Sequence, residues 1–483
     1  MYTCAGSRIR RTSVFAAATA AVVAGLALLT APMVAASQPR LTSPAVGFEA
    51  ALDPVFSPPP ATTAARFGYR PSPLAPVTVA PSTHALSARA ATAGLTTTRY
   101  PSRYDLRSRG RMSAVRDQGP LGACWAFATF GSLESILLPA ERRDFSEDNL
   151  LLRSGFDWGY SDGGNDQMAA AYLLRWSGPV NESSDAYGDG YAPPGLTAEK
   201  HVQSWVRLPR PASPRSLSVL KGAMERFGAL YAVIEYAPGS YRSRTHAYYY
   251  AGTSGPNHAI DIIGWNDGYR ATNFSRRPPG NGAFLCRNSW GRTWGARGYF
   301  WVSYYDRFIE SNVSAFPQVE KATNFASCYQ YDPCGETDGL GWPSSPTGWF
   351  ANRFTAVANG SLAAVGFGVP SGNAAYWVYA GASLSQLTQV ASGSTAFAGF
   401  TTVKLRTPVT LTSGRSFVVA VCQVTPGYGY PVPVEVPIPG YDSRATALPG
   451  QSFVSSDGKS WTDLTTIPGC ADSNACLKAY TSN

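Results

Sequence analysis

One cysteine of this chain stands where a helix is expected to begin, and that position favours nucleophilic chemistry. Cys124 follows a loop with two glycines and precedes an apolar run, in the stretch Gln118-Gly-Pro-Leu-Gly-Ala-Cys124-Trp125-Ala-Phe127. The unpaired N–H groups and the dipole of a helix N-terminus stabilise negative charge, so they lower the pKa of a thiol placed there. Because the thiolate is the reactive form of cysteine, Cys124 is predicted to be a nucleophile.

Two further side chains complete this chemistry, and both lie far downstream. His258 opens an apolar run, and Asn288 stands two residues before Trp290. A histidine can take the proton from a thiol and return it to a leaving amine, and an amide oxygen can hold the imidazole in the right orientation. The remaining histidines lack such a context and are predicted to be structural or exposed: His84, His201 and His246.

The three motifs around Cys124, His258 and Asn288, in this order, resemble those of papain-like cysteine peptidases over residues 100–316. The resemblance implies an α+β fold with two lobes: a helical half with the cysteine, a β-rich half with the histidine and asparagine, and the site in the cleft between. It also implies that Gln118 and the backbone N–H of the cysteine stabilise the oxyanion. The expected activity is that of an endopeptidase working through a Cys124 thioester, and no metal or other cofactor is expected.

The same resemblance implies how protein or peptide substrates bind. Gly163 and Gly164 match the family's substrate-binding loop, and the backbone of Gly164 would pair with an extended peptide. Ala259 and residues near Asp166 and Met168 are expected in the adjoining pocket, whose preference the sequence does not define. Trp290 would shield the hydrogen bond between histidine and asparagine.

The chain departs from the family's pattern at several positions. Leu121, Arg153 and Ser161 stand where many members have disulfide-bonded cysteines. The core of this domain is therefore predicted to be held by packing alone, which a domain of about 215 residues permits. Asn257 replaces the aspartate that often precedes the histidine, so the family's pH profile is not transferred.

The first hundred residues predict export. Three arginines, an apolar run and a small-residue exit form a secretory signal peptide over residues 1–36. The protein is therefore expected to be secreted, with no membrane attachment after cleavage. Residues 37–99 are rich in Pro, Ala, Thr and Ser and are predicted to be extended. Family members usually carry a helical prosegment that lies backwards along the active site, and this segment lacks the amphipathic period of such a helix. A reduced propeptide and a simple linker both remain open.

The charge distribution disfavours a nucleic-acid partner. The chain of 483 residues has a net charge of +9, and residues 1–99 contribute +6 of it. The remainder is close to neutral, so no strongly basic surface is expected there.

Residues 323–483 predict an all-β sandwich, because short alternating runs are separated by Gly, Ser and Pro turns. This region resembles the lectin-like domain that follows the peptidase domain in some prokaryotic relatives. The resemblance implies attachment to a glycan, a cell surface or a protein substrate, and a spacer role is the alternative. In an oxidising compartment two small disulfide loops are expected, Cys328–Cys334 and Cys470–Cys476, with Cys422 unpaired.

Two other functions remain open. The chain would be a surface-binding or adhesive protein if its peptidase domain bound peptides without turnover. Within the papain-like enzymes, a transpeptidase or an exopeptidase is the second alternative.

Overall fold

The computed structural model describes residues 50–53, 67–73, 99–213, 216–342 and 345–483. The predicted signal peptide, residues 1–36, lies outside the described residues, as does most of the segment 37–99. Among the described residues, no helix is both long and apolar enough to cross a membrane.

The region between residues 100 and 316 contains both helices and strands. The helices pack mainly through buried side chains, and the strands belong to one sheet. The helices are α2 (Cys124–Leu137), α3 (Glu147–Arg153), α4 (Asp166–Leu174) and α5 (Ser218–Phe227). The strands are β2 (Arg103–Asp105), β3 (Lys200–Leu208), β4 (Leu230–Ile234), β5 (Tyr241–Arg242), β6 (Ala247–Tyr248), β7 (His258–Asn266), β8 (Ala283–Arg287), β9 (Tyr299–Ser303) and β10 (Val313–Lys321).

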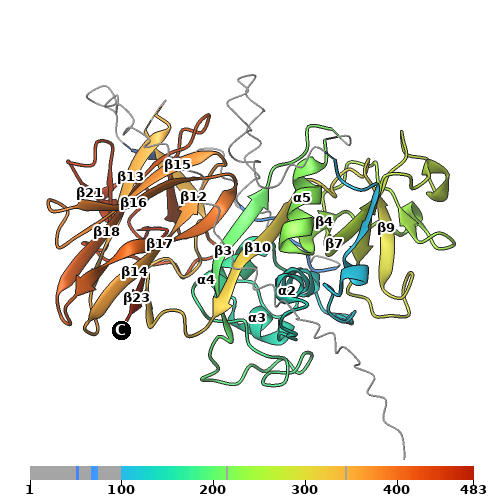
Figure 1. The fold of residues 1–483 in the computed structure, drawn as a ribbon, viewed down its shortest axis with the longest axis horizontal. Helices are drawn as coiled ribbons and strands as arrows, with labels where there is room; N and C mark the ends of the chain where they lie inside the picture. Colours follow the sequence, from blue (N-terminus) through green and yellow to red (C-terminus); the bar gives the residue numbers. More distant parts are fainter. Residues whose placement is uncertain (1–49, 54–66, 74–98, 214–215, 343–344) are drawn as a thin grey trace, which may run out of the picture. The chain divides into compact units, whose positions relative to one another are not determined.

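The helix α2 is the centre of the helical half. It is buried from Cys124 to Ser135, because it packs against β7 and β10 as well as α3 and α4 (Figure 1). The two shorter helices begin at side-chain caps. Ser146 accepts a hydrogen bond from the backbone N–H of Asn149, and Asn165 accepts one from that of Met168. These caps explain why the helices start where they do, since each satisfies an N–H group that the first turn leaves unpaired.

The sheet of the β-rich half runs in the order β3-β10-β4-β7-β8-β9-β6. Its neighbours are antiparallel except β6 and β9. The strand β7 is buried from His258 to Trp265, and an aliphatic and aromatic core packs against it. Because both faces of β7 are covered, its sequence is a nearly continuous apolar run rather than an alternating one.

The C-terminal region is built from strands. They are β11 (Ser327–Tyr329), β12 (Asp338–Gly341), β13 (Thr347–Thr355), β14 (Gly360–Val369), β15 (Ala374–Gly381), β16 (Thr388–Thr395), β17 (Ala398–Leu411), β18 (Ser416–Val424), β19 (Val432–Glu435), β20 (Ser452–Ser455), β21 (Thr462–Asp463), β22 (Asn474–Ala475) and β23 (Leu477–Ser482).

These strands form a β-sandwich, so the predicted α+β peptidase fold followed by an all-β region is confirmed. One sheet has the order β16-β15-β18-β13-β20-β21, and the other contains β11-β23-β14-β17. Their inner faces share a core that includes Phe350 of β13, Phe367 of β14 and Val419 of β18. On β18, Phe417, Val419 and Val421 enter this core, and the alternate residues Val418 and Ala420 pack in a second buried cluster on the other face.

The two regions are joined through main-chain hydrogen bonds. At the start of β17, Ala398 to Phe400 pair with Trp205 to Arg207 of β3. Gly399 has a φ of 127°, and a Cβ there would overlap the Trp205 carbonyl. A glycine is therefore required for this close approach.

A short piece of the N-terminal segment belongs to the C-terminal region. The strand β1 (Ala51–Leu52) pairs with β12, and the Asp53 carboxylate accepts a hydrogen bond from the Tyr428 hydroxyl at 2.9 Å. The segment before the peptidase region is thus attached to the sandwich by strand pairing.

The cysteines correct one expectation. All seven cysteines of the described residues are free thiols, so the expected disulfides Cys328–Cys334 and Cys470–Cys476 are not formed. The side chains of the first pair lie in different environments. Cys334 packs in the core around α2, whereas Cys328 packs beside Tyr480 and Phe325. Closeness in sequence was a poor guide here, because β11 ends at Tyr329 and the turn that follows carries Cys334 into a different core.

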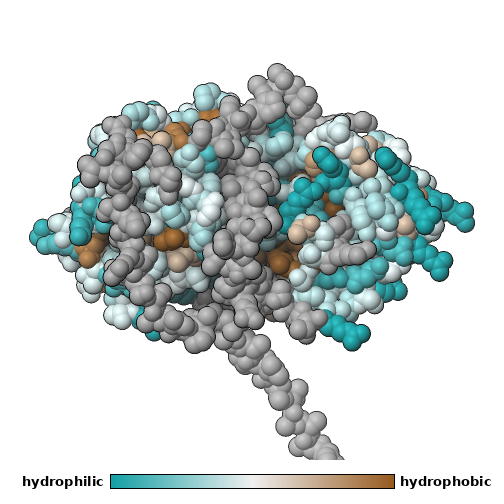
Figure 2. All heavy atoms as spheres, turned by 90° about the horizontal axis from the view of Figure 1, so that it is seen from above, coloured by the Kyte–Doolittle hydropathy of each residue, from teal (hydrophilic) through white to brown (hydrophobic). Residues whose placement is uncertain are grey.

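On the face shown in Figure 2, the residues drawn in colour range mostly from hydrophilic to neutral, and the hydrophobic spots among them are small and separate. Three large hydrophobic side chains of the described residues are strongly exposed: Tyr191, Val357 and Leu448.

Candidate active site

Cys124 is the first residue of α2, as the sequence predicts. The preceding residue, Ala123, makes no side-chain hydrogen bond to the helix N–H groups. Those groups are therefore free to stabilise a negative charge on the sulfur. The Sγ atom of Cys124 accepts a hydrogen bond from the backbone N–H of Ala259 at 3.3 Å. Ala259, expected near the substrate pocket, thus lies directly beside the predicted nucleophile.

His258 and Asn288 come together because β7 and β8 are neighbouring strands. The Nε2 atom of His258 lies 2.8 Å from Oδ1 of Asn288. The backbone N–H of Ser289 also donates to this Oδ1, at 2.8 Å, which turns the amide oxygen toward the imidazole. Nε2 therefore carries the proton of the neutral ring, and Nδ1 keeps its lone pair. Nδ1 has no hydrogen-bond partner among the described residues, so it is available as a base.

Trp290 covers this histidine. Its ring stacks on that of His258, with 4.7 Å between the centroids and 24° between the planes. Tyr236 and Trp294 meet the same indole edge-on, at 4.6 Å and 5.1 Å. The aromatic rings of Trp290, Tyr236 and Trp294 thus lie over the face of His258, and the shielding role of Trp290 stays a prediction.

Gln118 is buried, and its contacts determine which end of the amide faces the cleft. Its Oε1 accepts a hydrogen bond from the Ser289 hydroxyl at 2.6 Å. Its Nε2 donates to the Leu121 carbonyl at 2.8 Å and to the Phe67 carbonyl at 2.9 Å. Gln118 therefore presents an N–H group to a carbonyl in the cleft, as a donor to an oxyanion must.

Gly163 and Gly164 have different reasons to be glycine. Gly163 has a φ of 93°, in the left-handed region, and a Cβ on Gly164 would overlap the Trp125 ring. The N–H of Gly164 donates to the Gly68 carbonyl at 2.8 Å, and its carbonyl accepts from the N–H of Arg70 at 2.9 Å. Gly164 thus pairs through both backbone groups with an extended chain, as predicted for a substrate.

The extended chain is residues 67–73, which we call the cleft segment. The Phe67 ring lies 5.5 Å from that of His258 and 5.3 Å from that of Trp290. At Gly68 the φ is 111°, and a Cβ there would overlap the backbone of Gly122. Only a glycine lets the cleft segment come this close to the loop before the predicted nucleophile.

The cleft segment passes Gln118 first and Gly164 second. Its pairing with Gly164 through Tyr69 is parallel, and the Tyr69 N–H also donates to the Asn257 carbonyl at 3.3 Å. Sequence analysis did not find this segment, because it has no helical period. The available signal was the pair of aromatic residues, Phe67 and Tyr69, in a stretch otherwise dominated by Pro, Ala and Thr.

Burial under the cleft segment keeps the catalytic pair neutral. It raises the pKa of the Cys124 thiol to about 12. It lowers the pKa of His258 to about 4, although the hydrogen bond from the Asn288 side opposes this shift. Both side chains are fully buried. The buried environment therefore favours the neutral thiol and the neutral imidazole over the ion pair, because charges are poorly stabilised without water.

Acid is expected to loosen the cleft segment. The pKa of His258 is about 4 in the covered state, and that of a histidine in water is about 6.5. At a pH between these two values, His258 is protonated in the uncovered state and neutral in the covered state. The covered state is therefore stable above pH 6.5 and loses stability as the pH falls toward 4. Between pH 7.5 and pH 5 the ratio of uncovered to covered molecules should rise on the order of 30-fold. Hydrogen exchange of the peptide that contains Tyr69, corrected for intrinsic rates, measures this ratio in a Cys124→Ala chain that cannot cut itself.

The control for this pH dependence is a second substitution, His258→Gln, in the same Cys124→Ala chain. The raised pKa of buried Asp166 acts in the opposite direction, so the doubly substituted chain should show a flat or inverted profile. An equally steep acid response in both chains would contradict the assignment to His258.

The strands that carry His258 and Asn288 are tied together by a buried ion pair. Asp261 of β7 stands opposite Arg287 of β8, and Arg287 donates to Asp261 Oδ2 at 2.7 Å and 2.9 Å. A Cβ at Gly131 of α2 would overlap both side chains. The helix with the nucleophile therefore contacts the ion pair beside the base, an arrangement that spacing in the sequence did not reveal.

A loop of the C-terminal sandwich lies at the far end of the cleft. The Trp158 indole donates to the Gly440 carbonyl at 2.8 Å, and the Tyr441 hydroxyl lies 3.3 Å from Asn165 Oδ1. The Arg70 guanidinium of the cleft segment sits 3.9 Å above the Trp158 ring. Residues of both regions thus line the path that the cleft segment follows.

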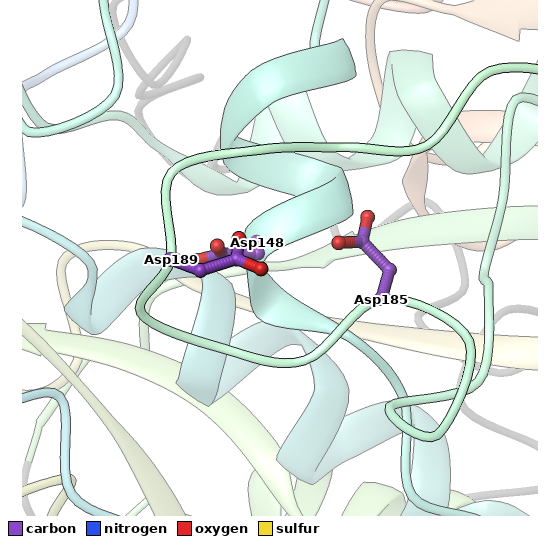
Figure 3. A group of neighbouring side chains, drawn as sticks. All are labelled: Asp148, Asp185 and Asp189. Atoms are coloured by element: carbon purple, nitrogen blue, oxygen red, sulfur yellow. The ribbon is translucent and has the colours of Figure 1, made fainter.

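Among the described residues, one group of three acidic side chains is close enough to share an ion: Asp148, Asp185 and Asp189 (Figure 3). Asp148 accepts hydrogen bonds from the Tyr160 hydroxyl and the Gly190 N–H. These protein donors already account for both of its oxygens, and we assign no metal to the group.

The described histidines that were predicted to be structural lie away from the site. His201 stacks on Trp176 with 3.5 Å between the ring centroids, and His246 lies 3.0 Å from the Tyr241 hydroxyl. His84 lies outside the described residues.

Comparison with known proteins agrees with this geometry. Residues 100–316 match the papain family cysteine protease model, and residues 328–481 match the lectin-like domain model. Testin-2 of Rattus norvegicus is 30% identical over 211 residues, covering 41% of this chain and 59% of that protein. Cysteine proteinase 15A of Pisum sativum is 28% identical over 225 residues, covering 43% and 58%. The chain thus spans less than two thirds of the length of these relatives.

Solved structures extend the likeness to both regions. The cysteine protease and lectin-like domains of Cwp84, a surface layer associated protein of Clostridium difficile, match with a TM-score of 0.71 and 24% identity. That match covers 80% of this chain and 90% of the other. Clostridial Cwp84 after propeptide cleavage matches with a TM-score of 0.70 and 25% identity, covering 79% of this chain and 100% of the other. The chain therefore contains a cysteine protease domain of the papain family, followed by a lectin-like domain.

Proposed function

We propose that this protein is a secreted cysteine-type endopeptidase, with a peptidase domain at 100–316 and a lectin-like domain at 323–483. The observation that carries the proposal is the arrangement around one carbonyl. Gln118 donates to the Phe67 carbonyl, and the Phe67 ring packs on the imidazole of His258. A peptide bond thus already lies among the predicted catalytic groups.

The chemistry follows from the hydrogen bonds. Nδ1 of His258 takes the proton of the Cys124 thiol, and the thiolate attacks the substrate carbonyl carbon. Gln118 Nε2 and the backbone N–H of Cys124 stabilise the oxyanion. The imidazolium returns its proton to the departing amine, which leaves a thioester on Cys124. Water then attacks the thioester, with His258 as the base. Asn288 holds the ring without adding a negative charge.

The cleft segment supports endopeptidase rather than exopeptidase action. It extends on both sides of Gly68, with Phe67 against Trp290 at one end and Arg70 over Trp158 at the other. A cleft that holds a continuous chain on both sides of the nucleophile does not need a free terminus. Residues 37–99 then act as a propeptide whose cleft segment must be displaced before substrate binds.

The location of the protein follows from the predicted signal peptide and from its structural relative. The relative from Clostridium difficile is a surface layer associated protein. By analogy, the lectin-like domain would attach the peptidase to a glycan or protein at a cell surface.

The test is product mapping with a peptide library. Purified, reduced protein is compared with its Cys124→Ala form after the cleft segment has been released, and every cleavage is identified by mass spectrometry. Internal cuts by the unmodified protein alone support the endopeptidase. End-trimmed or ligated products would instead identify an exopeptidase or a transpeptidase, and an intact library would leave a protein that binds peptides without turnover.

A further inference from the structure

The pocket that holds Tyr69 has apolar walls and a polar end. Tyr69 is 5% exposed, and it packs in the same cluster as Met168 and Ala259. At the hydroxyl, the Nδ2 atom of Asn312 lies 3.5 Å from the phenol oxygen. The same Nδ2 donates to Asp166 Oδ1 at 3.0 Å. One amide thus connects the hydroxyl of the bound side chain to a buried carboxylate.

This polar end has spare hydrogen-bonding capacity. Asp166 is 3% exposed, and the Ser314 hydroxyl faces its carboxylate. The buried hydroxyl of Tyr231, which lies within the field of Asp166 and Tyr69, has no hydrogen-bond partner among the described residues. A buried polar atom without a partner is costly, so a donor that reaches this end of the pocket is favoured over an apolar group.

The pocket opens beside Gly164, where a substrate backbone is proposed to pair. Tyr69 enters it from the residue that forms the bridge with Gly164. A substrate residue that pairs with Gly164 would direct its side chain into the same space.

We propose that this pocket selects tyrosine at the substrate position that pairs with Gly164, and that Asn312 and Asp166 recognise its hydroxyl. The preference rests on the proposed peptidase function, because it names a substrate class for that site. The ring fills the apolar walls, and the hydroxyl meets the amide and carboxylate. A basic side chain is less suited, since the Arg207 guanidinium already provides positive charge near Asp166.

The experiment uses the full-length chain with Tyr69→Ala, after the cleft segment has been released as for product mapping, so that the prosegment does not fill the pocket. Peptides identical except for Tyr, Phe, Leu or Arg at one position are compared by kcat/KM, after library mapping has located that position relative to the cut. Tyrosine should exceed phenylalanine by about tenfold, because one buried hydrogen bond distinguishes them. In the added variants Asn312→Leu and Asp166→Asn the ratio of the tyrosine to the phenylalanine peptide should fall toward one.

The outcomes separate this preference from the proposed function. Equal cleavage of the tyrosine and phenylalanine peptides, or a preference for arginine, overturns the assignment and leaves the peptidase intact. No cleavage of any peptide would instead contradict the peptidase. If Asn312→Leu fails to fold, as shown by its thermal melt, the isosteric Asp166→Asn variant decides the question. An independent readout is the Tyr69→Phe chain, whose cleft segment should open about tenfold more often in hydrogen exchange.

Discussion

Replacing His258 with alanine is expected to lower kcat/KM for peptide cleavage by about 10⁴-fold or more, because the thiol then has no base. Its Nδ1 has no hydrogen-bond partner among the described residues, Nε2 is held by Asn288, and the next residue, Ala259, contacts the Cys124 sulfur. Substituting Asn288 with alanine should cost less, about 10-fold to 100-fold, since the imidazole stays but loses its orientation. Both constants are measured with one fluorogenic peptide after release of the cleft segment.

The matched control for that experiment is His246→Ala. Like His258, this histidine has a side-chain hydrogen-bond partner, the Tyr241 hydroxyl, but it is outside the site. Its removal should leave kcat/KM within about twofold of the unmodified protein, provided that the melting temperature is similar. Full activity in the His258→Ala protein would show that another group activates Cys124.

The largest expected effect on stability comes from Arg287→Met. The side chains of Arg287 and Asp261 are 7% and 3% exposed, so the substitution leaves an unpaired carboxylate in the core. Loss of one partner of a buried pair typically costs about 3–5 kcal/mol. Urea unfolding should show this decrease in the free energy of unfolding, and the activity should fall too, because the pair lies between the strands of His258 and Asn288.

Two further variants test the reason for that loss. In Arg287→Met combined with Asp261→Leu, neither charge of this pair remains buried, and part of the stability should return. Buried Glu134, which Arg287 also stabilises in its charged form, keeps the recovery incomplete. Arg107→Met breaks the exposed pair with Asp105, whose side chains are 40% and 32% exposed, and should cost at most about 1 kcal/mol. Equal losses for Arg287→Met and Arg107→Met would mean that burial does not control the energy of these pairs.

The catalytic groups were predictable because each carries a local signal. Cys124 precedes an apolar helix after a glycine loop, and a buried strand begins at His258. The β-sandwich could be predicted from alternating runs. Disulfides between neighbouring cysteines could not, because Cys328 and Cys334 enter different cores. Two cysteines that are close in sequence can therefore pack in different clusters when a turn lies between them.

The cleft segment shows the limit of pattern reading most clearly. Residues 67–70 show no helical period in the sequence, because they are extended. Their backbone groups form hydrogen bonds with Gly164 and Asn257, which are far away in the sequence. The proposed role of Asn312 was equally hidden, because that residue is far in sequence from both Tyr69 and Asp166.

The sequence by itself therefore determined the type of chemistry, through residue types whose roles depend on short local motifs. It predicted the nucleophile, the base and their amide partners, and it predicted the class of fold, which the structure confirms. Only the tertiary structure decided what fills the cleft, which groups form the end of its pocket, and which protonation state the covered pair adopts. These properties depend on burial and on contacts between distant segments, and neither is encoded in the spacing of residues along the chain.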